Sequence, residues 1–225
     1  MRKYLTELIG TFFLVFTICA AVVSGSVLAP LAIGGVLAAM IFAGGHISGA
    51  HYNPAVTVAV WVRGRLATRE LLPYMAAQVI GAIAGAATAR VVAGAPSEAF
   101  SASGSKLGSA LVAELAVTFA LAFVVLNVAT SKSHPNNSFY GLAIGFTVLA
   151  GAVAVGGVSG GVFNPAVAVG VSAAGLISWS MLWVYLVANF VAGALAGAVF
   201  RVLNPGDVEA PAPVESQPAE ATGTA

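Results

Sequence analysis

Six stretches of this 225-residue chain are almost continuously apolar, and polar side chains gather in the short segments between them. Each stretch is long enough to cross the hydrocarbon core of a bilayer, which is about 30 Å thick and requires roughly 20 helical residues. Apolar runs of this length with few charges predict transmembrane helices. The expected spans are residues 5–25, 28–45, 71–93, 108–129, 139–157 and 177–202.

Two further apolar segments are only half as long, and each opens with the same three residues. Asn53-Pro54-Ala55 leads into residues 54–62, and Asn164-Pro165-Ala166 leads into residues 165 to about 174. Asparagine is a good helix N-cap and proline is favoured at the first helical position, so each motif predicts a helix start. At about 1.5 Å per residue, each helix is roughly 15 Å long, half of the hydrocarbon core. We therefore expect two half-helices that reach only to the centre of the membrane.

The two halves of the chain are copies of each other. Each copy holds three spans and one half-helix, so the second copy crosses the membrane in the opposite sense and the repeat is inverted. The half-helices then enter from opposite faces and meet N-terminus to N-terminus near the midplane. The copies cover about residues 4–93 and 108–203 of a single domain, residues 1–204. The matched pairs are Ser48 with Ser159, Tyr74 with Tyr185, Gln78 with Asn189, and Glu7 with Glu114.

The composition supports a membrane protein and excludes other classes. Hydrophobic residues make up 59% of the chain and charged residues only 8%, whereas a soluble domain carries about 25% charged residues. A net charge of +1 without a basic patch gives no basis for binding nucleic acid. The single cysteine, Cys19, cannot form an internal disulfide, and His46, His51 and His134 have no cysteine or carboxylate at ligand spacing. We expect an all-α integral membrane protein with no metal, no cofactor and no catalytic constellation.

The basic residues predict the orientation in the membrane. With the N-terminus in the cytoplasm, seven of the nine lysines and arginines face inward, and only Arg90 and Lys106 face outward. We therefore expect a multi-pass protein of the plasma (inner) membrane with both termini in the cytoplasm. Residues 205–225 are rich in proline, alanine and glutamate, which predicts a disordered cytoplasmic tail.

The repeated motifs predict a polar site at the centre of the bilayer. Two asparagine amides there can donate hydrogen bonds to a passing oxygen, and the two helix N-termini add partial positive charge. Non-helical backbone at this depth is tolerated only where it is buried in protein or lines a water-filled cavity. The expected result is a narrow polar file that accepts neutral hydrogen-bonding solutes and repels cations.

The sequence resembles the aquaporin, or major intrinsic protein, family over residues 4 to about 203. The resemblance rests on the paired Ser-Gly-x-x-x-Asn-Pro-Ala elements, the glutamates of the first and fourth spans, and the duplicated layout. It implies six tilted helices plus two re-entrant half-helices, a homotetramer with one pore per subunit, and passive flow of water or small uncharged solutes. It also implies that Glu7 and Glu114 bind backbone groups of the re-entrant loops. His51 is expected to brace its loop by hydrogen bonds, with pH sensing as the alternative.

The chain departs from the family pattern at the constriction that selects solutes. Most members place arginine after the second Asn-Pro-Ala, where this chain has Val167. Counting from the two asparagines puts the other constriction positions at Ile33, Ala152 and Gly161, where water-selective members carry an aromatic residue, a histidine and a small residue. A filter of these four residues has no cation and no strong side-chain donor. We therefore expect a wide, apolar filter that passes polyols, urea or undissociated metalloid acids together with water.

Three other functions compete with a channel. Secondary transporters also use inverted repeats and broken helices, and intramembrane glutamates could couple transport to protons. No acidic residue lies beside either Asn-Pro-Ala motif, which disfavours this alternative. A non-conducting adhesion or scaffold protein would need large exposed loops, and an enzyme would need a nucleophile, base or metal cluster, so the sequence favours both less.

Overall fold

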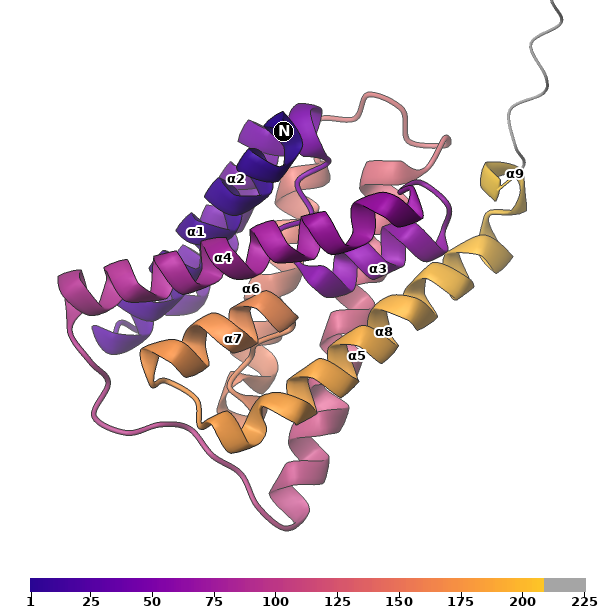
Figure 1. Cartoon of the computed structure of the whole chain (residues 1–225). Coiled ribbons are helices and arrows are strands. Elements are labelled where there is room, and N and C mark those ends of the chain that lie inside the picture. Colours follow the sequence, from indigo (N-terminus) through magenta and orange to yellow (C-terminus); the bar gives the residue numbers. More distant parts are fainter. Residues whose placement is uncertain (209–225) are drawn as a thin grey trace, which may run out of the picture.

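The computed structural model describes residues 1–208, and residues 209–225 lie outside the described part. The prediction of an all-helical membrane fold is confirmed: six helices are long and apolar enough to span a bilayer (Figure 1). The fourth continues as a π-helical turn, η1 (Leu126–Thr130), and the sixth follows a short 3₁₀ turn, η2 (Trp179–Met181). The six helices are α1 (Arg2–Val23), α2 (Ala29–Ser48), α4 (Thr68–Ala93), α5 (Ser105–Val125), α6 (Tyr140–Ser159) and α8 (Leu182–Leu203).

Two short helices, α3 (Pro54–Val62) and α7 (Pro165–Ala174), follow the second and fifth long helices. Each starts at the proline of an Asn-Pro-Ala motif, as the sequence predicts, because the preceding asparagine adopts an extended backbone and caps the first turn. Each also packs on a long helix of the opposite repeat, α3 on α8 and α7 on α4. This exchange brings the N-termini of the two short helices together inside the bundle (Figure 1).

Glycines let the helices cross at close range. Gly81 and Gly85 of α4 face the backbone of α1, and a Cβ at either position would lie 2.3 or 2.4 Å from a carbonyl oxygen. Gly193 of α8 faces Ala55 of α3 in the same way, at 2.3 Å. The Gly-x-x-x-Gly spacing predicts such contacts. The α2–α6 crossing depends on Gly34, whose Cβ would lie 2.7 Å from the Gly145 carbonyl oxygen.

The α2–α6 crossing provides a matched test of packing with two neighbouring glycines. Gly34→Ala is expected to destabilise the protein, because the new methyl group would meet backbone and would force the helices apart. Gly35→Ala adds the same group where no heavy atom lies within 4 Å, so it should be neutral or stabilising by up to about 1 kcal/mol through helix propensity. Thermal unfolding in detergent would measure both variants. Equal melting temperatures for the two would contradict a packed crossing at Gly34.

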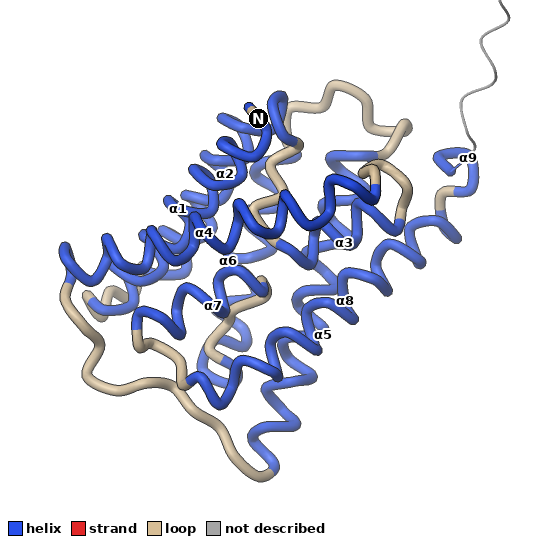
Figure 2. Tube along the Cα trace, viewed as in Figure 1, coloured by secondary structure: helices blue, strands red, loops and turns tan. Residues whose placement is uncertain are grey.

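Apart from the two re-entrant loops inside the bundle, the connecting segments lie at its two ends (Figure 2). The N-terminus, the loop between α5 and α6, and the C-terminal end of α8 lie at one end. The linker between α4 and α5, residues 94–104, crosses the other end. Both ends of the described chain therefore lie on the same side, as six spans require.

The sequence predicted a disordered tail from Pro205 onward, and this boundary is too early. Pro205–Val208 form a helical turn, α9, and Asp207 in this turn accepts hydrogen bonds from the Arg63 side chain at 3.2 Å and from the Lys132 backbone N–H at 3.0 Å. The Arg63 guanidinium also lies 4.5 Å from the centre of the Phe200 ring. A buried arginine requires such partners, and the start of the tail is ordered because it supplies one. The rest of the predicted tail lies outside the described residues.

The same contacts determine the protonation of Asp207. Desolvation alone would raise the pKa of this carboxyl, but the Lys132 N–H hydrogen bond and the Arg63 charge hold the pKa below its ordinary value. The ion pair with Arg63 is therefore present at neutral pH. It is lost only as the pH falls through that lowered pKa.

Candidate pore site

The repeated Ser-Gly pair ends a long helix and turns the chain into each re-entrant loop. Gly49 and Gly160 are the C-caps of α2 and α6, with φ of 86° and 87°. Glycine is favoured there because it adopts the left-handed conformation without a Cβ clash. The next residue is also left-handed in both copies, Ala50 at φ 50° and Gly161 at φ 66°. The loops thus follow the same irregular path, and the C-cap preference of glycine could have predicted its start.

Glu7 holds the first loop through both oxygens of its carboxylate. Oε1 accepts hydrogen bonds from the Ser48 hydroxyl at 2.7 Å and the His51 backbone N–H at 2.9 Å. Oε2 accepts from the Tyr52 backbone N–H at 2.7 Å and the Gln78 amide at 2.8 Å. Glu7 is fully buried, and these donors compensate the cost of burying its charge.

Glu114 holds the second loop with the same geometry. Oε1 accepts from the Ser159 hydroxyl at 2.7 Å and the Val162 backbone N–H at 2.9 Å, and Oε2 accepts from the Phe163 backbone N–H at 2.7 Å. This carboxylate is also fully buried. The two glutamates therefore satisfy backbone groups that would otherwise be unpaired inside the membrane.

Two tyrosines complete the attachment of the loops, and the sequence reasoning gave them no role. The Tyr74 hydroxyl donates to the Ser48 carbonyl oxygen at 2.9 Å, and the Tyr185 hydroxyl donates to the Ser159 carbonyl oxygen at 2.6 Å. Their equivalence in the repeat was the available signal. It was insufficient because the tyrosines lie far from the motifs in the chain.

His51 joins a network that exists only in the first repeat. Its Nδ1 lies 3.2 Å from the Thr57 hydroxyl, which donates to the Asn53 carbonyl oxygen at 2.9 Å and accepts from Gln78 at 3.0 Å. With the hydroxyl hydrogen donated to Asn53, a neutral imidazole would donate from Nδ1 to Thr57 and keep Nε2 as an acceptor. His51 is nearly buried, at 9% exposure. Its hydrogen bonds fit the expected bracing of the loop.

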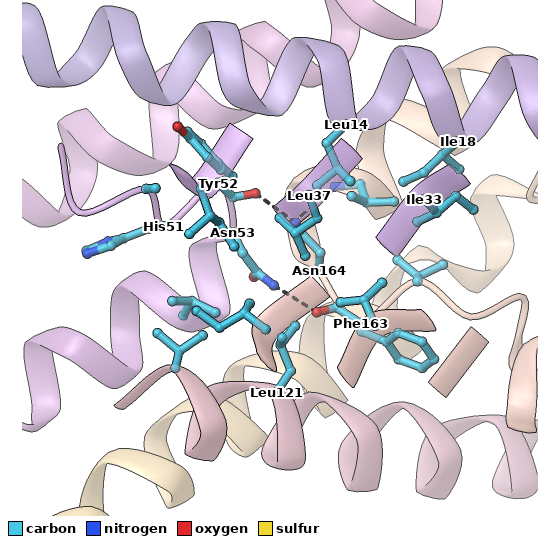
Figure 3. A pocket seen from close by; sticks show the side chains of 18 of the residues that line it. Leu14, Ile18, Ile33, Leu37, His51, Tyr52, Asn53, Leu121, Phe163 and Asn164 are labelled. Atoms are coloured by element: carbon cyan, nitrogen blue, oxygen red, sulfur yellow. Dashed lines mark hydrogen bonds between the residues drawn. The ribbon is translucent and has the colours of Figure 1, made fainter. Parts of the chain in front are cut away.

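The two motif asparagines each bind both repeats. The Asn53 side-chain oxygen accepts from Ala55 N–H at 2.8 Å, and its amide nitrogen donates to the Phe163 carbonyl oxygen at 2.9 Å. Asn164 makes the equivalent hydrogen bonds in the second repeat, and its amide nitrogen donates to the Tyr52 carbonyl oxygen at 2.8 Å (Figure 3). An amide carries two N–H donors, and no described residue accepts the second hydrogen of either amide. One donor of each asparagine is therefore available at the junction of the repeats.

A narrow cavity passes between these amides, and we call it the central constriction. Its volume open to the centre of a water molecule is about 30 Å³, enough for a few waters at about 10–15 Å³ each. Asn53 and Asn164 line it together with aliphatic side chains such as Leu37 and Leu121 (Figure 3). The lining of the constriction thus combines two amide groups with aliphatic side chains.

Much larger cavities adjoin the central constriction on both sides. Toward the α4–α5 linker lies what we call the wide cavity, with about 320 Å³ open to water centres, and it shares Ile33, Gly161 and Val167 with the constriction. Toward the N-terminal end lie two cavities of about 270 Å³ each, and these share His51 and Ile144 with the constriction. The shared lining residues place these spaces next to one another in a series that we call the path, and the smallest of them lies at the asparagines.

The structure brings all four residues of the expected filter to the wide cavity. Ile33 comes from α2, Ala152 from α6, Gly161 from the second re-entrant loop and Val167 from the first turn of α7. No described residue that lines this cavity has a polar side chain. The backbone of the second re-entrant loop, unlike these side chains, offers hydrogen-bond acceptors. No described residue donates a hydrogen bond to the carbonyl oxygens of residues 160–162. The loop that lines this cavity therefore carries carbonyl oxygens without a donor among the described residues.

Two capped half-helices meet at the centre of this inverted repeat of helices. This arrangement defines a class of membrane proteins that are built around a central pore. The family model for "Major intrinsic protein" matches residues 1–200. The chain belongs to this family. Members of the family are passive channels, so the chain is a channel for water or small solutes and not an enzyme.

Individual relatives include proteins named as aquaporins and one named as a glycerol uptake facilitator. A glycerol uptake facilitator protein-like 6 of Lactiplantibacillus plantarum is 40% identical, over 92% of this chain and 100% of its own length. Aquaporin NIP1-3 of Oryza sativa is 41% identical, over 88% of this chain and 71% of its own length. Among solved structures, the aquaglyceroporin of Plasmodium falciparum has a TM-score of 0.76 at 23% identity, over 92% of this chain and 98% of that one. This last similarity supports the shared fold.

Proposed function

We propose that the chain conducts small uncharged solutes together with water, through a wide filter of Ile33, Ala152, Gly161 and Val167 that has no arginine. The solutes are polyols, urea or undissociated metalloid acids. The observation that carries the proposal is the shape and lining of the path. A constriction with two amide donors adjoins a tenfold larger cavity without a polar side chain.

The lining supports neutral solutes that carry hydrogen-bond donors. Transfer of a hydroxyl into apolar surroundings costs about 1–3 kcal/mol unless it finds a partner. Hydroxyl or amide hydrogens of a solute can meet the unpaired carbonyl oxygens of residues 160–162, while its carbon atoms face the aliphatic wall. An ion would lose far more hydration without compensation. The glycerol-related name of the bacterial relative agrees with this solute class.

We assign cation and proton exclusion to the central constriction. The N-termini of α3 and α7 meet there, and each contributes about half a positive charge. Positive half-helix ends of this kind exclude protons and cations in aquaporin-type pores. Because Val167 supplies no charge in the wide cavity, this barrier acts alone.

The buried glutamates support a channel over a coupled transporter. A proton-coupled carrier needs a carboxyl group that can exchange protons with the path. Glu7 and Glu114 instead accept hydrogen bonds from the re-entrant loops at both oxygens and have no exposed surface. Neither glutamate lines any of the four cavities of the path.

We further propose that the N-terminal end of the bundle faces the cytoplasm of a plasma (inner) membrane protein that assembles as a homotetramer. Seven basic residues belong to this end, and the wide cavity opens at the other, where Arg90 and Lys106 flank the α4–α5 linker. Solutes would then meet the wide cavity first from outside. The positive-inside distribution supports the orientation, and the family resemblance supports the tetramer.

Stopped-flow light scattering on proteoliposomes tests the proposed function. Wild-type protein should accelerate the flux of water, glycerol, urea and arsenious acid above empty liposomes, without saturation and without an ion gradient. Saturable flux that depends on an ion gradient would favour a transporter. Flux of water alone would contradict the wide filter.

A further inference from the structure

The wide cavity has one wall that comes from outside the repeat. The linker between α4 and α5 brings Phe100 to the same cavity as Ile33, Ala152 and Val167. Phe100 is the one aromatic residue among the described residues that line it. The sequence reasoning missed this residue, because the linker has no counterpart in the other repeat and belongs to neither motif.

Backbone hydrogen bonds hold Phe100 in this place. Its N–H donates to the Leu176 carbonyl oxygen at 2.8 Å, and its carbonyl oxygen accepts from the Ser178 N–H at 3.0 Å. These bonds form an isolated parallel bridge to Ile177. Leu176 and Ile177 also line the wide cavity. The linker is therefore pinned to the segment that follows α7, and it cannot move without breaking two hydrogen bonds.

The ring of Phe100 reaches the second re-entrant loop. A Cβ built on Gly160 would lie 3.6 Å from Cδ1 of Phe100, so the ring packs over this glycine. Gly161, the next residue, belongs to the proposed filter. Phe100 is partly exposed and packs at the edge of the hydrophobic core. It thus presents a large, partly open apolar side chain where the cavity has otherwise small or aliphatic ones.

We propose that Phe100 is a specificity-determining residue of this channel, and that its ring sets the largest solute that enters the wide cavity. This inference rests on the proposed function of the cavity. The filter positions themselves supply neither the aromatic ring nor the arginine that narrows other members of the family. In this channel the ring of Phe100, which the linker holds in position, limits the cross-section of the wide cavity instead. Since only the backbone of Phe100 is hydrogen-bonded, its side chain can change while the linker stays attached.

The test is the flux ratio of ribitol to glycerol in proteoliposomes, measured for Phe100→Ala, Phe100→Trp and wild type. Phe100→Ala should raise the ratio about tenfold, the scale on which an apolar pocket discriminates one methylene group. Phe100→Trp should lower it, because the larger ring closes the cavity further. Phe139→Ala is the matched control, since Phe139 is exposed at the opposite end and lines none of the cavities of the path. Its ratio should equal that of wild type.

The two variants change the cavity in opposite directions, so the inference stays testable if one of them fails to fold. Ratios equal to wild type in every folded Phe100 variant, in liposomes where wild type conducts glycerol, would overturn the role of Phe100 and leave the proposed function intact. A wild-type protein that conducts no neutral solute would overturn both.

Discussion

Val167→Arg is expected to convert the channel into a narrow, water-preferring one. Val167 lines both the central constriction and the wide cavity, so an arginine here would place a bulky cation in the path. Its guanidinium would bring donors and a positive charge to a cavity that has neither among the described residues. We expect glycerol flux to fall about tenfold or more, which corresponds to roughly 1.4 kcal/mol of additional barrier. Water flux should fall less, because water needs a smaller opening.

A parallel Val167→Met variant separates size from charge in this experiment. Methionine adds length without a charge or a strong donor. Stopped-flow measurement of water, glycerol and urea should show an intermediate loss for methionine and the largest loss for arginine. If the glycerol-to-water ratio of Val167→Arg equals that of wild type, Val167 does not belong to the filter.

Glu114→Ala is expected to prevent stable folding. The substitution leaves the Ser159 hydroxyl and the Val162 and Phe163 N–H groups without their acceptor in a fully buried site. Each unsatisfied buried donor costs about 1–3 kcal/mol, and the total approaches the whole stability of a typical domain, about 5–15 kcal/mol. The second re-entrant loop would lose its support, and Asn164 would lose its fixed position. Size-exclusion chromatography in detergent and the melting temperature would measure the loss.

Two comparisons make this prediction specific to the hydrogen bonds. Glu114→Gln keeps one acceptor oxygen and should be destabilised less than Glu114→Ala. Glu98→Ala removes a carboxylate from the exposed α4–α5 linker, so it should melt like wild type. A folded Glu114→Ala protein with an unchanged melting temperature would show that the second loop is held mainly by packing.

The sequence by itself determined the elements of this protein and their duplication. The bilayer fixes the length of a span and the Asn-Pro pair fixes a helix start, and both signals are local. They predict six spans and two half-helices whose bounds agree closely with the structure. The Ser-Gly pair and the glycine spacings are local signals as well, because they report backbone conformation and close approach. Counting from the asparagines also predicted Ile33 and Ala152 as filter positions, and both residues line the wide cavity.

Only the tertiary structure decided how these elements form a path. Asn53 and Asn164 each bind a carbonyl of the opposite repeat, and Phe100 reaches the wide cavity from a linker without periodicity. Asp207 joins Arg63 across 144 residues of sequence. Such contacts depend on the angles at which helices cross and on where irregular segments return to them. A hydrophobic pattern encodes which face of a helix is apolar, but the partner of that face is chosen by packing in three dimensions.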